Sequence, residues 1–101
     1  MDPERISDIS ISDVVVSTAG RDQDTLFYVI GEDGLFLLLA NGKDRPLDRP
    51  KRKKRKHVQK VLRSETRVAN KLLTGDKVLN SELRRDLQFH AGQMQANNLG
   101  G

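Results

Sequence analysis

The chain has 101 residues, of which 36% are hydrophobic and 32% charged, and its formal net charge is +4. That length allows one small domain with a short accessory element and excludes two independent hydrophobic cores. The absence of cysteine excludes a disulfide framework and a thiolate zinc site, and it favours a reducing cytoplasm. The first residues show no basic segment followed by an apolar run, and no stretch approaches the roughly 18 apolar residues of a membrane span. We therefore expect a soluble, untargeted protein.

Three strands are predicted in the first half of the chain. The runs DVVVS at 13–17 and LFYVI at 26–30 are rich in β-branched and aromatic residues, and turn residues separate them. The apolar run LFLLLA at 35–40 follows a short glycine-containing connection and predicts a third strand. Asn41 and Gly42 close this strand, and the pair is typical of a type I′ hairpin. An antiparallel meander is the expected result.

Two further strands complete the predicted sheet. Short segments around Leu47 and over 57–62 supply them, and two nearby prolines confine the first of these strands to an edge or a bend. Five short strands within about fifty residues are the inventory of a small barrel. The fold class expected over 13–63 is therefore mainly β, with the cations of 51–56 in a loop between the fourth and fifth strands.

The C-terminal part predicts helices that cover the sheet. The third strand is apolar at every position, so a sheet with one solvated face would expose large side chains. Residues 64–90 predict a helical hairpin in which Ser64 caps the first helix and Gly75 ends it. A homodimer through the same apolar surface is the alternative. Residues 1–12 are expected to form an N-terminal extension, and 91–101 a flexible tail. The apolar stripe of the first predicted helix consists of Val68, Ala69, Leu72 and Leu73.

The charge distribution points to a polyanionic partner. Residues 1–42 hold two cations and eight anions, a charge of −6, whereas residues 43–63 hold eleven cations and two anions, a charge of +9. Within the second segment, KRKKRK at 51–56 is a run of six cations with no carboxylate inside it. Holding like charges together costs repulsion, which a polyanion such as RNA offsets. Pairing with the acidic first half of the chain would blunt this effect.

The basic run allows three interpretations: a solvated loop that keeps the protein soluble, a nuclear import signal, and a nucleic-acid contact. Predicted strands on both sides fix the run on the sheet, whereas an import signal more often lies in a mobile tail. This placement favours nucleic acid. Base readout on a single strand normally recruits exposed aromatic rings. Aromatic residues are only 4% of this chain, and all four lie in apolar segments that favour the core. We therefore expect recognition of RNA shape and backbone.

No arrangement typical of an active site stands out. His57 and His90 are the only histidines, and no glycine-rich segment ends in GK followed by Ser or Thr. We expect a protein that is not an enzyme and has no cofactor or metal; an enzyme acting on an anionic substrate is an alternative. Another is a DNA-reading helix-turn-helix that presents Arg84 and Arg85, although the charge of +1 over 64–101 disfavours it.

Several motifs resemble KOW-domain RNA-binding proteins. The matching stretches are DVVVSTAGRD, LFYVI, ANGK and PLDRPKRKKRKHVQ, and the later LLTGDKVLNSELRRDL is similar to the helical end of small bacterial members. Those members are similar to large-subunit ribosomal proteins of the eukaryotic and archaeal type. The resemblance spans roughly residues 13–88. It implies an SH3-like β-barrel, with Gly20 as the motif glycine. Family members commonly carry a basic residue and a second glycine where this chain has Gln-Asp-Thr at 23–25.

The expected function is therefore a non-enzymatic, ribosome-associated RNA-binding module that clamps RNA phosphates through residues 43–63. The alternative is a protein-interaction adaptor with an SH3-like barrel, in which the cations serve solubility. The residues expected to face RNA are Gly20, Arg21, Lys43, Arg45, Arg49, Lys51, Arg52, Lys53, Lys54, Arg55, Lys56, His57, Lys60 and Arg63.

Overall fold

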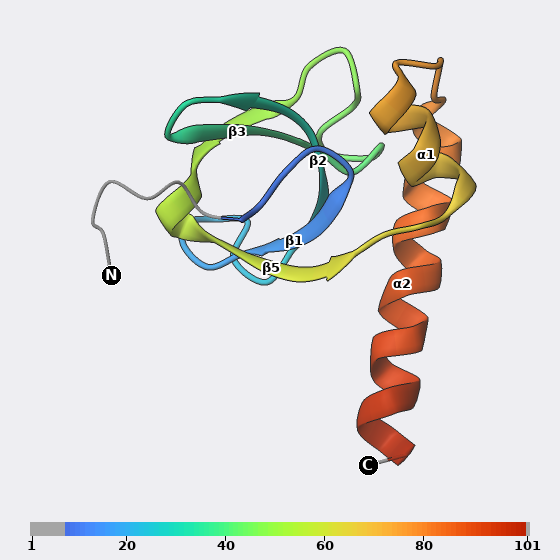
Figure 1. Cartoon of the computed structure of the whole chain (residues 1–101). Coiled ribbons are helices and arrows are strands. Elements are labelled where there is room, and N and C mark those ends of the chain that lie inside the picture. The colour runs from blue at the N-terminus through green and yellow to red at the C-terminus, as the bar shows by residue number, and fades with distance from the viewer. Residues whose placement is uncertain (1–7, 101) are drawn as a thin grey trace.

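The computed structural model describes residues 8–100, with side chains over 8–94. The strands are β1 (Asp13–Ser17), β2 (Leu26–Asp33), β3 (Phe36–Ala40), β4 (Lys51–Lys54) and β5 (Val58–Arg63). They form one curved sheet in the order β4-β3-β2-β1-β5, and every neighbouring pair is antiparallel (Figure 1). Two helices follow the sheet in the chain. The predicted small protein with five antiparallel strands and C-terminal helices is confirmed.

The fourth strand differs from the prediction. It is formed by Lys51–Lys54, the first part of the basic run, whereas Leu47 lies in the connection before it. Pro46 and Pro50 have no N–H to donate to a neighbouring strand, so regular pairing with β3 begins only after the second proline. A 3₁₀ turn, η1 (Arg55–His57), completes the basic run and leads into β5. The cations predicted to form a loop are therefore a strand and a tight turn.

The strands alternate between two hydrophobic clusters, one on each face of the sheet. Because successive side chains of a strand point to opposite faces, the apolar runs of β1, β2 and β3 supply both clusters. The cluster on the face away from the helices consists of Ile9, Val15, Phe27, Val29, Leu37, Leu39 and Val58. The cluster between the sheet and the helices consists of Val14, Tyr28, Ala40, Val68, Ala69, Leu83 and Leu87.

The first helix, α1 (Arg67–Thr74), begins two residues later than its predicted cap implies. Thr66 caps it, since its hydroxyl oxygen accepts a hydrogen bond from the backbone N–H of Ala69 at 3.2 Å. Gly75 ends the helix in the left-handed conformation, with φ of 78°, as predicted. Leu73, which was assigned to the apolar stripe, is 53% exposed.

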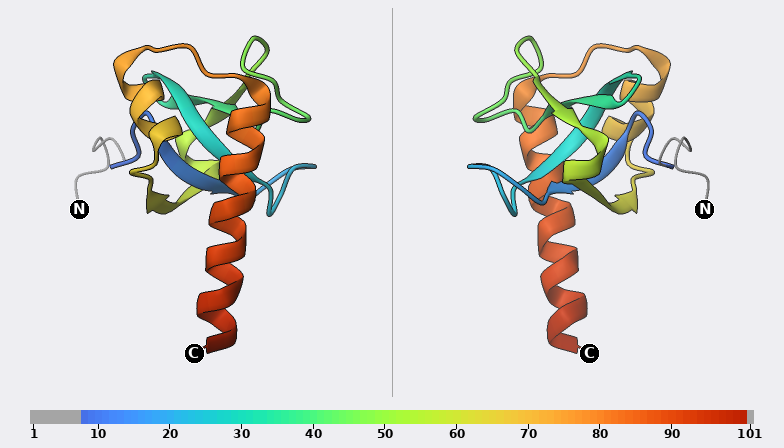
Figure 2. Two further views of the ribbon diagram at one scale, coloured as in Figure 1. Left: turned by 90° about the vertical axis from the view of Figure 1, so that its right-hand side faces the viewer. Right: turned by 90° about the vertical axis from the view of Figure 1, so that its left-hand side faces the viewer.

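The second helix, α2 (Asn80–Gly100), is longer than predicted. Its backbone is helical over 91–100, where a flexible tail was expected, and residue 101 lies outside the described residues. Leu83 and Leu87 are buried, as a helix packed on the sheet requires. The C-terminal half of α2 projects past the sheet (Figure 2). No helix among residues 8–100 is long and apolar enough to cross a membrane.

The helices cover only part of the outer face of the sheet. Val14, Tyr28 and Ala40 lie beneath them and are fully buried. Phe36, farther along β3, is half-buried outside that cluster. Its ring is covered instead by the guanidinium of Arg52, whose Cζ atom lies 3.6 Å from the ring centroid. The expectation that a helical pair shields the apolar third strand therefore holds for the end of β3 nearest α2.

Candidate nucleic-acid interface

Asp22 neutralises two lysines of the basic run. Its carboxylate oxygens lie 2.8 Å from Lys51 Nζ and 2.6 Å from Lys53 Nζ. Lys53 Nζ also donates to the carbonyl of Ala19 at 2.6 Å, and Ser17 Oγ donates to Asp22 at 2.8 Å. Burial acts to raise the pKa of Asp22, but the hydrogen bonds from the two lysines and the serine outweigh it and hold that pKa well below its usual range. Lys51 and Lys53 thus fix the loop after β1 onto β4.

Arg55 is a buried structural cation. Its side chain is 7% exposed, and its Nη2 atom donates to Glu32 Oε1 at 2.7 Å. Two further bonds reach backbone carbonyls, from Nε to Gly34 at 2.7 Å and from Nη1 to Ile9 at 2.9 Å. Removing a planar fork that serves three acceptors would leave those oxygens without their donors. Arg55 therefore ties the end of β4 to the β2–β3 turn and to the segment before β1.

The eleven cations of residues 43–63 divide into two groups. Five of them pair with carboxylates outside the segment: Lys51 and Lys53 with Asp22, Arg52 with Asp33, Arg55 with Glu32, and Lys60 with Asp13. Within the part of the chain that the structure describes, the other six have no ion-pair partner. They are Lys43, Arg45, Arg49, Lys54, Lys56 and Arg63, and all six are exposed. These exposed cations are the members of the predicted RNA-facing set that remain available to phosphates.

The six available cations do not form a single loop. Three of them lie in the connection over 41–50, at the end of β4 nearer the helices (Figure 1). Lys54 and Lys56 lie at the opposite end of β4 and in η1, and Arg63 ends β5. A strand of four residues separates the first two groups, so one phosphate cannot engage both. The loop of six cations predicted over 51–56 is thus a strand and a turn, and of that run only Lys54 and Lys56 belong to the available cations.

The connection over 41–50 is docked on the start of α2. Gly42 has a φ of 76°, and a Cβ atom there would collide with the backbone carbonyl oxygen of Asn80. The backbone N–H of Leu47 donates to the side-chain oxygen of Asn80 at 2.8 Å. Asn41 and Gly42 therefore do not form the predicted two-residue hairpin. They begin a long connection whose conformation α2 helps to set.

The loop after β1 holds Gly20, the glycine expected from the resemblance. Gly20 adopts a φ of 86°, as its position after a strand predicted. Arg21 is exposed beside Asp22, whose carboxylate is already engaged. His57 is half-buried, and its carbonyl accepts a hydrogen bond from the backbone N–H of Thr18 at 2.9 Å. Of the family-derived positions in this loop, Arg21 is the one that presents a charge to solvent.

Two residues of α2 gain importance in the structure. Phe89 was assigned to the core but is 54% exposed, because the buried positions of α2 are 83, 87 and 90. Arg84, considered only in the DNA-reading alternative, lines a surface groove together with Lys43. Helical periodicity predicts the exposure of Phe89, whereas the contact between α2 and the connection after β3 has no local sequence signal.

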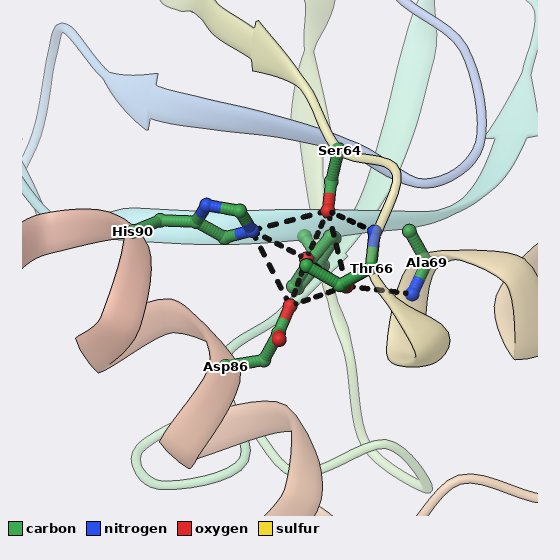
Figure 3. A network of polar contacts seen from close by, with 6 residues as sticks. Ser64, Thr66, Ala69, Asp86 and His90 are labelled. Carbon is green, nitrogen blue, oxygen red and sulfur yellow. Dashed lines mark hydrogen bonds and ion pairs between the residues drawn. The ribbon is translucent and has the colours of Figure 1, made fainter. Parts of the chain in front are cut away.

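A buried polar network joins the sheet to α2 (Figure 3). Tyr28 Oη donates to Asp86 Oδ2 and lies 2.7 Å from Ser64 Oγ and 3.1 Å from His90 Nε2. Thr66 Oγ1 donates to the same Asp86 oxygen at 2.9 Å. Burial, followed by the hydrogen bond to Asp86, raises the pKa of the Tyr28 hydroxyl far above its usual value. Ser64, the predicted cap of α1, belongs to this network, whereas Thr66 both takes part in the network and caps the helix.

The network does not have the geometry of a Ser-His-Asp triad. Ser64 Oγ lies 3.0 Å from His90 Nε2, and Asp86 Oδ2 lies 3.4 Å from the same nitrogen. A triad needs the carboxylate and the nucleophile on opposite ring nitrogens. Ser64 is also only 4% exposed. The described residues hold no group of three or more His, Cys, Asp or Glu side chains that could bind a metal ion.

Comparison with models of protein families finds no match for the chain, and comparison with curated proteins finds none either.

Proposed function

We propose that the protein is a non-enzymatic RNA-binding module of the KOW type, associated with the ribosome in the cytoplasm. In this proposal the curved sheet is an SH3-like barrel, and the exposed cations of residues 43–63 bind RNA phosphates. The motifs quoted above support the family, and the five-stranded antiparallel sheet is compatible with it. Translation, or assembly of the translation machinery, is the process in which such a module would act.

One observation carries the proposal. After the ion pairs of residues 43–63 are taken into account, six exposed cations have no partner within the described part of the chain. Intramolecular ion pairs therefore reduce the positive charge that residues 43–63 offer to a partner, but they do not remove it. Each phosphate that such a cation meets releases condensed counterions, which supplies affinity without sequence information.

The test is a fluorescence-anisotropy titration with a labelled RNA hairpin over a range of salt concentrations. The variants are Lys54→Gln with Lys56→Gln at one end of β4, and Lys43→Gln, Arg45→Gln and Arg49→Gln at the other. We expect weaker binding from both sets, and a salt slope that is shallower by about 0.7 to 0.9 per phosphate contact removed. Lys77→Gln is the matched control, because Lys77 is exposed and lies outside the basic segment. The proposal fails if both sets bind RNA with the affinity and slope of the Lys77 variant.

Association with the ribosome needs its own experiment. We expect the tagged protein to co-sediment with a ribosomal subunit on a sucrose gradient and to leave that fraction after nuclease treatment. If the protein stays at the top of the gradient in both samples, it does not associate with the ribosome. That result would leave the proposed binding to RNA to the titration above.

The second candidate function is a protein-interaction adaptor, and exposed apolar side chains favour it. Leu73 is 53% exposed, Leu79 51% and Phe89 54%, all in or between the helices. If these side chains lie in one contiguous patch, that patch is a candidate interaction surface, including the interface of a homodimer. An adaptor would retain one protein partner from nuclease-treated lysate at high salt. A homodimer would show twice the chain mass in sedimentation equilibrium.

A further inference from the structure

A groove of about 250 Å³ lies where the connection after β3 meets α2. Leu26 at the start of β2 and Leu87 and Ala91 of α2 supply its apolar lining. Ligand sites typically combine an apolar lining with a few fixed polar groups, and this volume lies just below the range for drug-sized ligands. The groove therefore has room for one small group and not for a large molecule.

Asn41 holds a fixed side-chain amide at this groove. Its side-chain oxygen accepts bonds from the backbone N–H groups of Lys43 and Arg45, at 2.9 and 3.0 Å, which identifies that atom as the oxygen and immobilises the amide. The residue is only 9% exposed and lines the groove. Its amide nitrogen has no hydrogen-bond partner among the described residues, yet it is not among their fully buried unsatisfied atoms. The nitrogen is thus an accessible, unused donor.

The charged groups at the groove are cations only. Lys43 and Arg84 line it, one from the connection after β3 and the other from α2, and both are exposed. Gln88, one turn beyond Arg84, adds a neutral amide. No carboxylate lines the groove. The chemistry that fits is an anion joined to an apolar ring with a carbonyl or ring-nitrogen acceptor at its edge.

We propose that this groove binds one nucleotide of an RNA strand, with the base against Leu26, Leu87 and Ala91 and its phosphate between Lys43 and Arg84. Asn41 donates to an acceptor on the base edge. Because the Asn41 oxygen is occupied, the contact uses the N–H donor of this amide, which a carbonyl or a ring nitrogen of any base can accept. The inference rests on the proposed RNA binding and adds a base contact to the phosphate contacts.

A direct test uses small probes and nuclear magnetic resonance. We expect uridine 5′-monophosphate at millimolar concentration to shift the Ala91 and Leu87 methyl signals and the Asn41 side-chain amide. Ribose 5-phosphate carries the same charge without a base and should leave the two methyl signals in place. Equal shifts with ribose phosphate or with a glutamate-rich peptide would show a simple anion site and overturn the inference. Absence of shifts with uridine monophosphate would overturn it as well.

A second test fills the groove without changing charge. Ala91→Leu should weaken binding of a uridine octamer by about tenfold, roughly the loss of one hydrogen bond and some apolar contact. An abasic octamer of the same length should bind both proteins equally. Gln93→Leu is the matched control, since Gln93 is exposed on α2 and does not line the groove.

The outcomes separate the two proposals. If the octamer binds with the expected dependence on the six exposed cations but Ala91→Leu has no effect, the groove inference fails and the proposed function stands. If neither octamer binds the natural chain, the contact with a base of an RNA strand is overturned, and the hairpin titration alone decides the proposed function. A base-dependent shift with uridine monophosphate would then leave the groove as a nucleotide site independent of RNA.

Discussion

Adjacent residues of β4 have opposite roles. Lys53 is 8% exposed and bonded to Asp22, whereas Lys54 is exposed and has no ion-pair partner within residues 8–94. The two-residue period of a strand turns one ammonium toward the loop after β1 and the next toward solvent. Composition alone treats the six cations of the run as equivalent. The alternation of side chains along the strand makes some of them structural and leaves others exposed to solvent.

Replacing Asp22 by Asn should destabilise the fold at neutral pH. Two lysines would lose their carboxylate partner, and we expect a loss of about 3 kcal/mol in the free energy of unfolding. The pKa of Asp22 is lowered by folding, so its contribution is present above the unfolded pKa near 4 and is lost as pH falls below it. Urea unfolding of both proteins between about pH 3 and pH 7 measures this, because the difference should shrink in acid. A difference that stays constant with pH would contradict the assignment.

Substituting Gly42 by Ala should be more costly than the same change at Gly34. Both residues have positive φ, so each variant pays roughly 1 kcal/mol for a left-handed alanine. A Cβ at Gly34 meets no atom within 4 Å, whereas one at Gly42 collides with the backbone of Asn80. We expect thermal unfolding to place the Gly42 variant clearly below the Gly34 variant in stability. Equal melting temperatures would contradict this prediction, because they would show that the connection after β3 can move away from Asn80 at little cost in stability.

At the scale of elements, four strands could be predicted because their apolar runs are local signals. β1 covers the predicted residues, and β2 begins at the predicted residue but ends three residues later. β3 begins one residue later than predicted, and β5 is shifted by one residue. The fourth strand could not be located in the same way. Lysine and arginine are poor indicators of strands, and the residues that stabilise β4 are acidic groups from β2 and the loop after β1. Those contacts exist only after the chain has folded.

For the candidate site, the sequence predicts the range of residues that carries the cations. It does not predict how their side chains are arranged in space. Charge counting located residues 43–63 correctly as the place where exposed cations concentrate. It could not identify Lys51, Lys53 and Arg55 as structural, because their partners lie 21 to 46 residues away. The groove beside Asn41 could not be predicted for the same reason, because residues of α2 that are far away in the sequence contribute to its lining.

The Tyr28 network should control how firmly α2 is attached. Tyr28→Phe keeps the ring and removes the hydroxyl, which leaves Asp86 and His90 short of a partner in a buried site. We expect a loss of about 2 kcal/mol. Hydrogen exchange should show faster opening of α2, with little change where β1 pairs with β2. Equal acceleration in the sheet and in α2 would mean that the hydroxyl serves the whole core.

For the whole molecule, folding brings the acidic first part of the chain onto the basic middle. Asp13, Asp22, Glu32 and Asp33 all precede the basic segment in sequence and pair with it in space. The charge of +9 counted along the sequence therefore overstates the positive field that an approaching polyanion would meet. The charges that remain are those on the surface.

The salt dependence of RNA binding measures how many cations take part. If the six exposed cations all met phosphates of a single strand, the slope of log affinity against log salt would be about −4, and participation of all eleven would give about −8. We expect a value no steeper than about −4 from titrations of single-stranded RNA between 50 and 200 mM salt. A slope near −8 would show that the ion pairs to Asp22, Asp33 and Glu32 open when RNA binds.

β4 is also an outer strand of the sheet, with β3 on one side of it. An outer strand leaves backbone groups free to pair with a second molecule, and like charges along it oppose such pairing. The exposed Arg52 and Lys54 of β4 would thus keep two copies of the chain from joining edge to edge. Exchanging them for neutral residues would then do two things at once, weakening RNA binding and permitting aggregation, so every charge variant should be checked for self-association before its affinity is interpreted.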